Sequence, residues 1–123
     1  MLPDTLLTIE LSILNKKLSL NKAQKFSKLF SLYNKEKRKY IYPGAFIRSV
    51  GIEMKETYEI LDAIERLGII EKVYEIYCPK CKYSTGAIYE SLNDLPDEYS
   101  CGNCDYDILP IENIIVIYKV LIE

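Results

Sequence analysis

The sequence predicts an α+β fold in which helices come first and strands come last. Apolar residues recur at helical spacing through the first half of the 123-residue chain. The last third is rich in β-branched and aromatic residues, most densely over 112–122. All four cysteines lie within residues 78–104 as two C-x-x-C pairs, and the chain contains no histidine. These three observations predict the α+β fold class.

The amino-terminal segment 1–20 is predicted to hold one helix, over residues 4–18. Asp4 is a suitable N-cap, and leucines recur on one stripe at i, i+4, i+7 and i+11. The stripe consists of Leu7, Leu11, Leu14 and Leu18. We expect it to be buried within the domain, because such stripes usually are; an intermolecular surface is the alternative.

A second helix is predicted from about Asn21, since apolar residues again share one face. They are Ala23, Phe26, Phe30 and Tyr33. A polar, basic linker is expected at 34–39, and Tyr40–Tyr42 predicts a short strand that ends at Pro43–Gly44.

The stretch PGAFIRSVGIEMKETYEILDAIERLGII, residues 43–70, predicts a short helix, a tight turn and a longer helix. The helices cover about 43–50 and 54–67, the turn contains Gly51, and Gly68 is the expected C-cap. In the longer helix the residues expected on one side are Met54, Thr57, Ile60, Leu61, Ile64 and Leu67. Helix, short strand, helix, helix and a strand at 69–77 resemble a winged helix-turn-helix domain over residues 21–77.

The four cysteines, Cys78, Cys81, Cys101 and Cys104, have the spacing C-x2-C-x19-C-x2-C. Two residues between ligands allow one tight turn to aim both sulfurs at a single ion, so each turn supplies half of a tetrahedron. Pro79 and Gly102 suit such turns, and Gly102 is expected to use backbone angles that other residues avoid. The sequence therefore predicts one structural Zn²⁺ ion in a small antiparallel zinc ribbon, which with a closing strand occupies 78–123.

Other chemistries for these cysteines are less consistent with the pattern. Four thiolates also suit a rubredoxin-like iron site. A redox C-x-x-C would be expected once, within a βαβ unit, and two disulfides would require an oxidising compartment. Four cysteinates would close the coordination shell of zinc, which favours a structural role over a catalytic one.

No catalytic constellation is recognisable, so we expect the protein not to be an enzyme. The five glycines form neither a P-loop nor a dinucleotide fingerprint, and a nucleophile would lack a histidine base. Two acidic clusters are expected to be solvated loops beside the cysteines. They are Asp94, Asp97 and Glu98, and Asp105 and Asp107.

Charge is divided unevenly along a chain whose net charge is only −2. Residues 1–50 hold ten Lys and Arg against three Asp and Glu, whereas residues 51–123 hold six against fifteen. The basic half contains the candidates for contact with nucleic acid, interleaved with Tyr33 and Tyr40. They are Lys22, Lys25, Lys28, Lys35, Lys37, Arg38 and Lys39. A solvated helix face with packed tyrosines is the simpler interpretation.

The outward face of the helix at 54–67 is a poor surface for DNA phosphates. It is expected to contain Lys55, Tyr58, Glu59, Asp62, Glu65 and Arg66. Acids outnumber bases on it, whereas a helix that enters the major groove gains from a basic neighbourhood. We expect this face to meet a protein partner or solvent.

A winged helix that continues into a four-cysteine zinc ribbon resembles the large subunit of general transcription factor IIE and its archaeal counterpart. The residues that carry the resemblance are those of 43–70, followed by CPKC and CGNC. The resemblance implies a non-enzymatic role in holding other proteins, with or without DNA, in a larger assembly. It departs from DNA-reading winged helices at the acidic second helix.

The expected function is therefore a zinc-stabilised adaptor for protein–protein assembly in a multi-component complex. A DNA- or RNA-binding transcription regulator that acts through the basic half is the alternative. Residues Met1–Asp4 lack the basic region of a signal peptide, and the apolar run Ile114–Tyr118 is too short to cross a bilayer. We therefore expect a cytoplasmic protein with reduced thiols.

Overall fold

The computed structural model describes residues 13–35 and 39–121, and these confirm the α+β class with antiparallel strand pairing. The chain forms two compact units. Unit 1 is Met1–Glu71 with Tyr118–Glu123, and unit 2 is Lys72–Ile117. The expected division into 1–20, 21–77 and 78–123 stays a prediction.

Unit 1 begins, within the described residues, with the short helix α2 (Asn15–Lys17) and the longer helix α3 (Leu20–Lys35). Leu14 and Leu18 are buried, as expected for the end of the leucine stripe. Leu7 and Leu11, and most of the helix expected at 4–18, lie outside the described residues. Asn34 and Lys35 belong to α3, so the linker expected at 34–39 begins too early; the apolar stripe that ends at Tyr33 gave no sign of this last turn.

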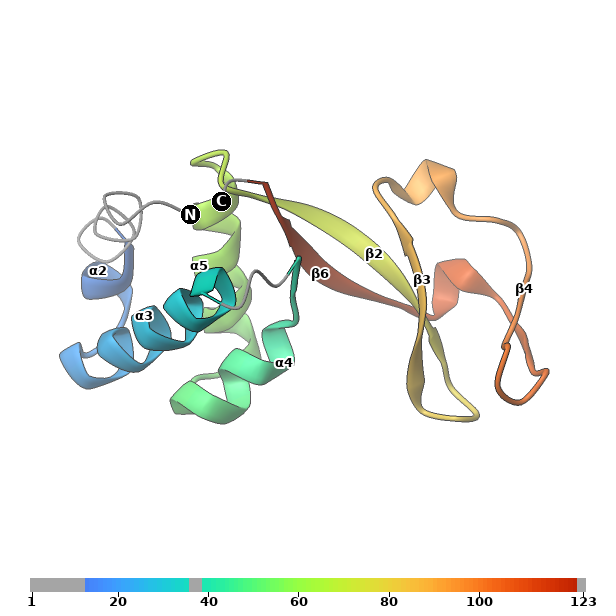
Figure 1. Cartoon of the computed structure of the whole chain (residues 1–123), viewed down its shortest axis with the longest axis horizontal. Helices are drawn as coiled ribbons and strands as arrows, with labels where there is room; N and C mark the ends of the chain where they lie inside the picture. Colours follow the sequence, from blue (N-terminus) through green and yellow to red (C-terminus); the bar gives the residue numbers. More distant parts are fainter. Residues whose placement is uncertain (1–12, 36–38, 122–123) are drawn as a thin grey trace. The chain divides into compact units, whose positions relative to one another are not determined.

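The apolar face of α3 is confirmed, since Ala23, Phe26, Phe30 and Tyr33 are all buried. They pack around Phe46 of α4 (Pro43–Phe46). The ring centroid of Phe46 lies 4.6 Å from that of Phe26, 6.2 Å from that of Phe30 and 5.5 Å from that of Tyr33. Aromatic pairs at such distances stabilise a core beyond the area that they bury. Figure 1 shows the helices α3, α4 and α5 of unit 1, which carry the buried face described above and its neighbours.

The helix-turn-helix segment is formed by α4, the π-helical turn η2 (Ile47–Gly51) and α5 (Met54–Glu65). Gly51 has φ +78° and Gly68 has φ +79°, a region that L side chains rarely adopt. Gly51 ends η2, as expected. Gly68 was expected to be the C-cap of α5, but the helix ends at Glu65 with Arg66 as its C-cap. Gly68 lies in a further turn, in which its N–H donates to the carbonyl of Glu65 at 2.9 Å. Thr57 begins the buried face of α5 and donates its hydroxyl to the carbonyl of Glu53 at 2.9 Å.

Two residues assigned to the buried face of α5 were placed wrongly. Met54 is 65% exposed and Leu67 is 45% exposed, whereas Ile60, Leu61 and Ile64 are fully buried. Met54 is the first residue of α5 and Leu67 follows its last turn. Correct helical spacing at an end of a helix does not ensure that a neighbouring element covers the residue.

Unit 1 is completed by β1 (Tyr40–Ile41) and the end of β6 (Ile114–Val120). The two strands are antiparallel, with Tyr40 opposite Lys119 and Ile41 opposite Tyr118. Tyr118 is fully buried and donates its hydroxyl to a carboxylate oxygen of Asp62 on α5 at 2.6 Å. This hydrogen bond joins residues far apart in the sequence, and no local pattern predicted it.

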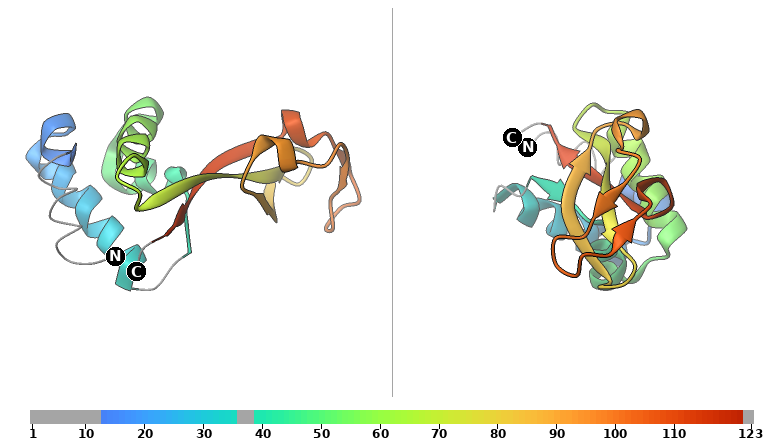
Figure 2. Two further views of the ribbon diagram at one scale, coloured as in Figure 1. Left: turned by 90° about the horizontal axis from the view of Figure 1, so that it is seen from above. Right: turned by 90° about the vertical axis from the view of Figure 1, so that its right-hand side faces the viewer.

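Unit 2 is made of short strands and turns that carry the cysteines. The hairpin of β2 (Ile70–Cys78) and β3 (Tyr83–Tyr89) encloses the first C-x-x-C turn, and its register shifts between Glu75 and Tyr77. The pair β4 (Tyr99–Ser100) and β5 (Asp107–Ile108) encloses the second. Figure 2 shows this pair beside the hairpin.

Two 3-10 turns connect the strands, and the strands form two sheets. The turns are η3 (Leu92–Asp94), before β4, and η4 (Pro110–Glu112), before β6. The larger sheet has the order β1-β6-β2-β3, and β4-β5 is a separate sheet. Within the described ranges, no helix has the length and apolar character needed to cross a membrane.

Candidate metal centre

The four cysteines expected to be ligands come together at the two C-x-x-C turns. Their sulfur atoms all lie within 4.8 Å of one another, and all four thiols are free of disulfides. The Sγ atoms of Cys78 and Cys104 are 3.7 Å apart, and those of Cys81 and Cys101 are 3.8 Å apart. Each of these short pairs joins one turn to the other. The arrangement is compatible with a structural metal ion held between the two turns.

The two turns have the same backbone geometry, although their sequences, CPKCK and CGNCD, differ. The N–H of Lys82 donates to the carbonyl of Cys78 at 2.7 Å, and the N–H of Asp105 donates to that of Cys101 at 2.9 Å. Each turn ends on a left-handed residue, Lys82 with φ 62° and Asp105 with φ 59°. Such a conformation is uncommon for lysine and more acceptable for aspartate.

The role expected for Gly102 is therefore wrong. The left-handed position of each turn follows the second cysteine rather than the first, and Gly102 is not among the residues with positive φ. The physical reason is the closing hydrogen bond from residue i+4 to the carbonyl of residue i, which requires the chain to reverse after the second cysteine.

Hydrogen bonds to sulfur orient the thiols. The backbone N–H of Cys81 lies 3.4 Å from the sulfur of Cys78 and donates to it. The side-chain amide of Asn103 donates to the sulfur of Cys81, also at 3.4 Å. Sequence reasoning did not single out Asn103, and its place inside CGNC was the only available signal. Donors of this kind stabilise thiolates and fix ligand geometry around a metal.

The pKa values of the second pair of thiols shift in opposite directions. The backbone N–H groups of Asn103 and Cys104 stabilise the Cys101 thiolate and lower the pKa of Cys101 to about 7. The pKa of Cys104 is raised to about 12, chiefly by its interaction with the thiol of Cys81. Sulfurs this close cannot all become thiolates unless a cation shares their charge. Binding of a metal ion would therefore release protons.

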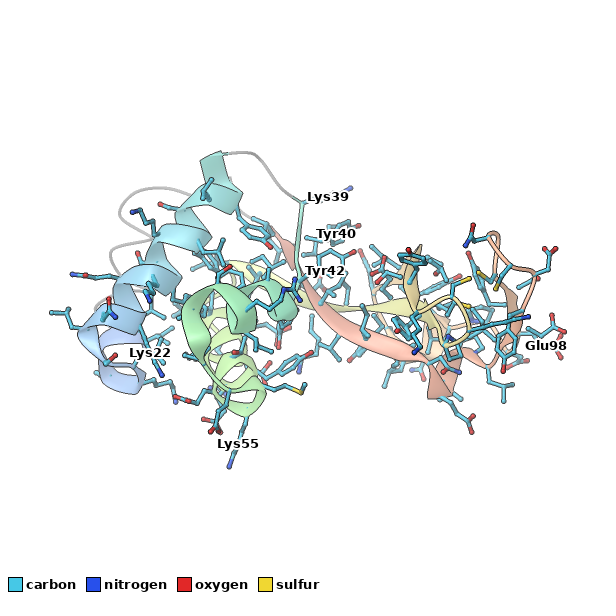
Figure 3. The ribbon with its side chains drawn as sticks, turned by 90° about the horizontal axis from the view of Figure 1, so that it is seen from below. Lys22, Lys39, Tyr40, Tyr42, Lys55 and Glu98 are labelled. Atoms are coloured by element: carbon cyan, nitrogen blue, oxygen red, sulfur yellow. The ribbon has the colours of Figure 1, made fainter. Side chains whose placement is uncertain are left out.

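Burial around the sulfurs is uneven. Cys78 and Cys101 are buried, and they form a small cluster with Ile76 and Ile108. Cys81 and Cys104 are half-buried. A pocket of about 410 Å³ adjoins Cys81 and Cys101 and is lined also by Tyr83, Thr85, Tyr99 and Asn103. In Figure 3 the sulfur atoms, drawn in yellow, gather at this part of unit 2.

Two polar side chains of this pocket, those of Thr85 and Asn103, form hydrogen bonds within the fold. Thr85 donates its hydroxyl to the carbonyl of Ile76 at 2.8 Å and accepts from the N–H of Ala87 at 3.2 Å. Asn103 is bound to a cysteine sulfur. The acidic residues expected in solvated loops are exposed, and among the described residues the four cysteines form the one group with metal-ligand geometry. The exposed acids are Asp94, Asp97, Glu98, Asp105 and Asp107.

The described lysines considered for nucleic-acid contact lie on α3 and directly before β1. Lys22, Lys25, Lys28 and Lys35 lie on α3, where Lys25 and Lys28 are exposed and Lys22 is half-buried. The ammonium of the exposed Lys39 lies 5.9 Å from the ring centroid of Tyr40. Lys37 and Arg38 lie outside the described residues. Tyr33 is buried against Phe46, so it packs in the core rather than offering a ring to a base.

The face of α5 considered for a protein partner is narrower than the sequence indicated. Lys55, Glu59 and Arg66 are exposed, and Figure 3 shows Lys55 pointing away from the helices. Tyr58, Asp62 and Glu65 are half-buried. The ring of Tyr58 lies 6.4 Å from that of Tyr118, and Asp62 accepts the hydroxyl hydrogen of Tyr118. Part of the outer face of α5 therefore contacts Tyr118 of β6 and is not available to a partner.

Comparisons with known proteins add no assignment. No protein-family model matches the chain. No curated protein and no solved structure matches it significantly.

Proposed function

We propose that this chain is a non-enzymatic adaptor, a zinc-stabilised winged helix with a zinc ribbon, which assembles other proteins in a multi-component complex. The observation that carries the proposal is a set of large apolar side chains exposed on unit 2. Tyr83 is 69% exposed, Leu109 is 53% exposed and Ile111 is 65% exposed. Covering these apolar side chains with a partner protein would remove their apolar area from water, which is favourable.

Zinc is the ion that we propose for the four cysteines. Four sulfurs placed tetrahedrally at the usual zinc–sulfur distance of about 2.3 Å are about 3.8 Å apart. The two short sulfur pairs, at 3.7 and 3.8 Å, agree with this spacing. The ion would be held by Cys78, Cys81, Cys101 and Cys104, and it would cross-link the two turns. With four thiolates bound, no position remains for water or substrate, which favours a structural role.

The winged-helix assignment is supported by the order of elements in the chain. Helix α3, strand β1, helices α4 and α5 and strand β2 follow one another as expected for that fold. Strand β6 then pairs with β1. The chain between β2 and β6, where a winged helix has a hairpin loop called the wing, holds the four cysteines. This order of elements favours the resemblance to the large subunit of general transcription factor IIE and its archaeal counterpart.

An adaptor is favoured over a reader of DNA sequence by the chemistry of α5. Among the described residues, the stretch 53–71 carries six acids against two bases, Lys55 and Arg66. Asp62 and Tyr58 are engaged with Tyr118, so they are poorly placed to contact base edges. A helix of this composition would be repelled by the phosphates that line the major groove.

The test is a capture of partners from native cells by the tagged, zinc-loaded protein, with half of each sample treated with nuclease. The informative variant is Leu109→Ser with Ile111→Ser. The matched control is Leu20→Ser with Leu32→Ser, because Leu20 and Leu32 are exposed in unit 1 at 67% and 44%. We expect nuclease-resistant partners that the control retains and the unit 2 variant loses at least tenfold.

A partner identified in this way is then purified and titrated against the wild type and both variants by calorimetry. Equal binding by the unit 2 variant and the wild type would contradict the proposed surface. Failure of the wild type to retain any protein after nuclease treatment would contradict the adaptor itself.

A further inference from the structure

The stretch from Ile13 to Lys35, which contains α2 and α3, is strongly basic. It carries six lysines and no aspartate or glutamate. The acids of unit 1 lie elsewhere, mainly in and after α5. Unit 2 has the opposite character, with three lysines against eight acids. The positive charge of the protein is thus concentrated on one short run of helices.

Five lysine side chains of this stretch have no acidic partner among the described residues. Lys16, Lys17, Lys25 and Lys28 are exposed, and Lys22 is half-buried. Within residues 13–35 and 39–121, no carboxylate forms an ion pair with any of these five. Unpaired ammonium groups that sit close together repel one another, and this repulsion is relieved when phosphates bind.

Helical geometry places the lysines of α3 away from the core. At about 100° per residue, Lys25 and Lys28 project opposite the buried stripe that includes Phe26 and Phe30, and Lys22 lies at its flank. The measured burial agrees with this placement. With a rise of about 1.5 Å per residue, Lys22 and Lys28 are about 9 Å apart along the helix axis. Figure 3 labels Lys22 on α3.

We propose that these lysines of α2 and α3 form a binding surface for the phosphate backbone of double-stranded DNA. Duplex DNA carries one charge per about 1.7 Å of its axis, so several phosphates lie within reach of a row about 9 Å long. The binding surface goes beyond the adaptor function and does not depend on it.

Single-stranded nucleic acid fits this surface less well. Single-strand binders add aromatic side chains on which bases stack. The aromatic residues of α3 are Phe26, Phe30 and Tyr33, and all three are buried. The exposed surface of α3 therefore offers charge without a stacking platform, which favours contacts to the backbone of a duplex.

Recognition by this surface is independent of base sequence. It lies on α2 and α3, whereas the acidic α5 is the helix that a winged helix would insert into the groove. Contacts from lysine to phosphate position a protein on DNA but carry no sequence information. The protein would hold DNA without selecting a site.

The test is fluorescence anisotropy of the zinc-loaded full chain with a labelled 20-base-pair DNA duplex over 20–300 mM KCl. Three to five lysine contacts give a slope of log K against log salt of about −3 to −4.5. In the variant Lys22→Gln, Lys25→Gln, Lys28→Gln, the slope should become shallower by about 2 to 3, with at least a tenfold loss of affinity at 50 mM KCl. Helical circular dichroism checks that α3 is intact.

The matched control is Lys55→Gln, Lys80→Gln, Lys82→Gln, three exposed lysines outside this stretch whose loss changes the net charge equally. Its slope should change by less than about 1. An equal loss in the two variants, or no duplex binding by the wild type at 20 mM KCl, overturns the proposal. So does tighter, equally lysine-dependent binding of duplex RNA or of a single strand. Salt-sensitive self-association without DNA binding would instead assign the surface to the acidic side of a second copy.

Discussion

Unit 1 and unit 2 obtain their stability in different ways. Unit 1 buries large side chains, among them Phe26, Phe30 and Phe46, whose rings contact one another. Around its cysteines, unit 2 has a small buried cluster of Ile76, Ile108, Cys78 and Cys101, and the two cysteines are candidate metal ligands. Half of the residues in that cluster are therefore cysteines rather than aliphatic side chains.

The difference shows how a short stretch of chain can be stable with few large apolar residues. A domain needs enough buried apolar area to offset the entropy lost on folding, and small units often depend on a metal instead. Tyr83, Leu109 and Ile111 remain exposed in unit 2 although its core is small. We therefore expect unit 1 to depend on its apolar core and unit 2 to depend on its metal.

The largest effect is expected from loss of the metal. Chelation, or Cys101→Ser, should unfold unit 2 and leave the helices of unit 1 largely formed. Structural zinc sites contribute on the order of 10 kcal/mol to folding, more than the small cluster of unit 2 can replace. Amide-resolved NMR spectra with and without chelator measure the effect, and the exposed Asp97→Asn is the control. Unchanged strand signals after chelation would show that the metal is dispensable.

Phe46→Ala is also expected to have a large effect, but on unit 1 instead of unit 2. Phe46 contacts three aromatic rings and is fully buried, so its truncation should lower the free energy of unfolding of unit 1 by about 3–5 kcal/mol. Urea denaturation followed by helical circular dichroism measures this loss. Thiolate-to-Co²⁺ absorption should be retained, since unit 2 holds all four cysteines. Loss of both signals together would mean that the units do not fold separately. The exposed Leu32→Ala is the control.

A smaller effect is expected at the hydrogen bond between Tyr118 and Asp62. Tyr118→Phe leaves a buried ring but removes the donor, which should cost about 1–3 kcal/mol. Thermal or urea unfolding measures it, and Tyr106→Phe, at an exposed ring, should change stability by less than about 0.5 kcal/mol.

The same tyrosine predicts a dependence on alkaline pH. Burial, and then the hydrogen bond to Asp62, raise the pKa of Tyr118 above its ordinary value of about 10. Its contribution is therefore complete below about pH 10 and is lost as the pH rises further, because the unfolded state then ionises more readily. The stability difference between wild type and Tyr118→Phe should shrink between pH 10 and pH 11. A constant difference would contradict the role of burial.

The smallest effect is expected at the left-handed end of the first cysteine turn. Lys82→Gly relieves a φ of 62° and should stabilise the metal-loaded protein by about 0.5–1 kcal/mol after the entropy cost of glycine. Lys80→Gly, in the same turn but without positive φ, should destabilise it by a similar amount. Competition with a chelator of known affinity compares the two variants. A loss of stability in both would indicate that the Lys82 side chain has a role of its own.

Local patterns predicted well where one residue type serves one purpose. The stripe of α3 is buried because Ala23, Phe26, Phe30 and Tyr33 have no other stable location, and the cysteine spacing brought four sulfurs together. The same reasoning was wrong for Met54 and Leu67, because helical period says nothing about what covers the end of a helix.

Features that depend on three-dimensional contact were not predictable from the sequence. Gly102 was assigned the unusual backbone angles that Lys82 and Asp105 adopt, since a glycine attracts that assignment and a lysine does not. The hydrogen bond from Tyr118 to Asp62 joins residues 56 positions apart, so no short window of sequence contains both partners. Lys16 and Lys17 were left out of the candidate surface, since the sequence assigned them to the helix predicted over 4–18 rather than to the basic helix after it.

Strand β6 has a consequence for the order of events during synthesis. Its first residues, Ile114–Ile117, belong to unit 2, and the following residues, Tyr118 onward, belong to unit 1. A chain emerging from the ribosome would have released α3, α5 and all four cysteines before either unit had its last strand. Until residue 120 has left the exit tunnel, β1 has no partner in unit 1, and the buried site that Tyr118 fills stays open. A nascent chain stalled before residue 114 would therefore hold two incomplete units at once.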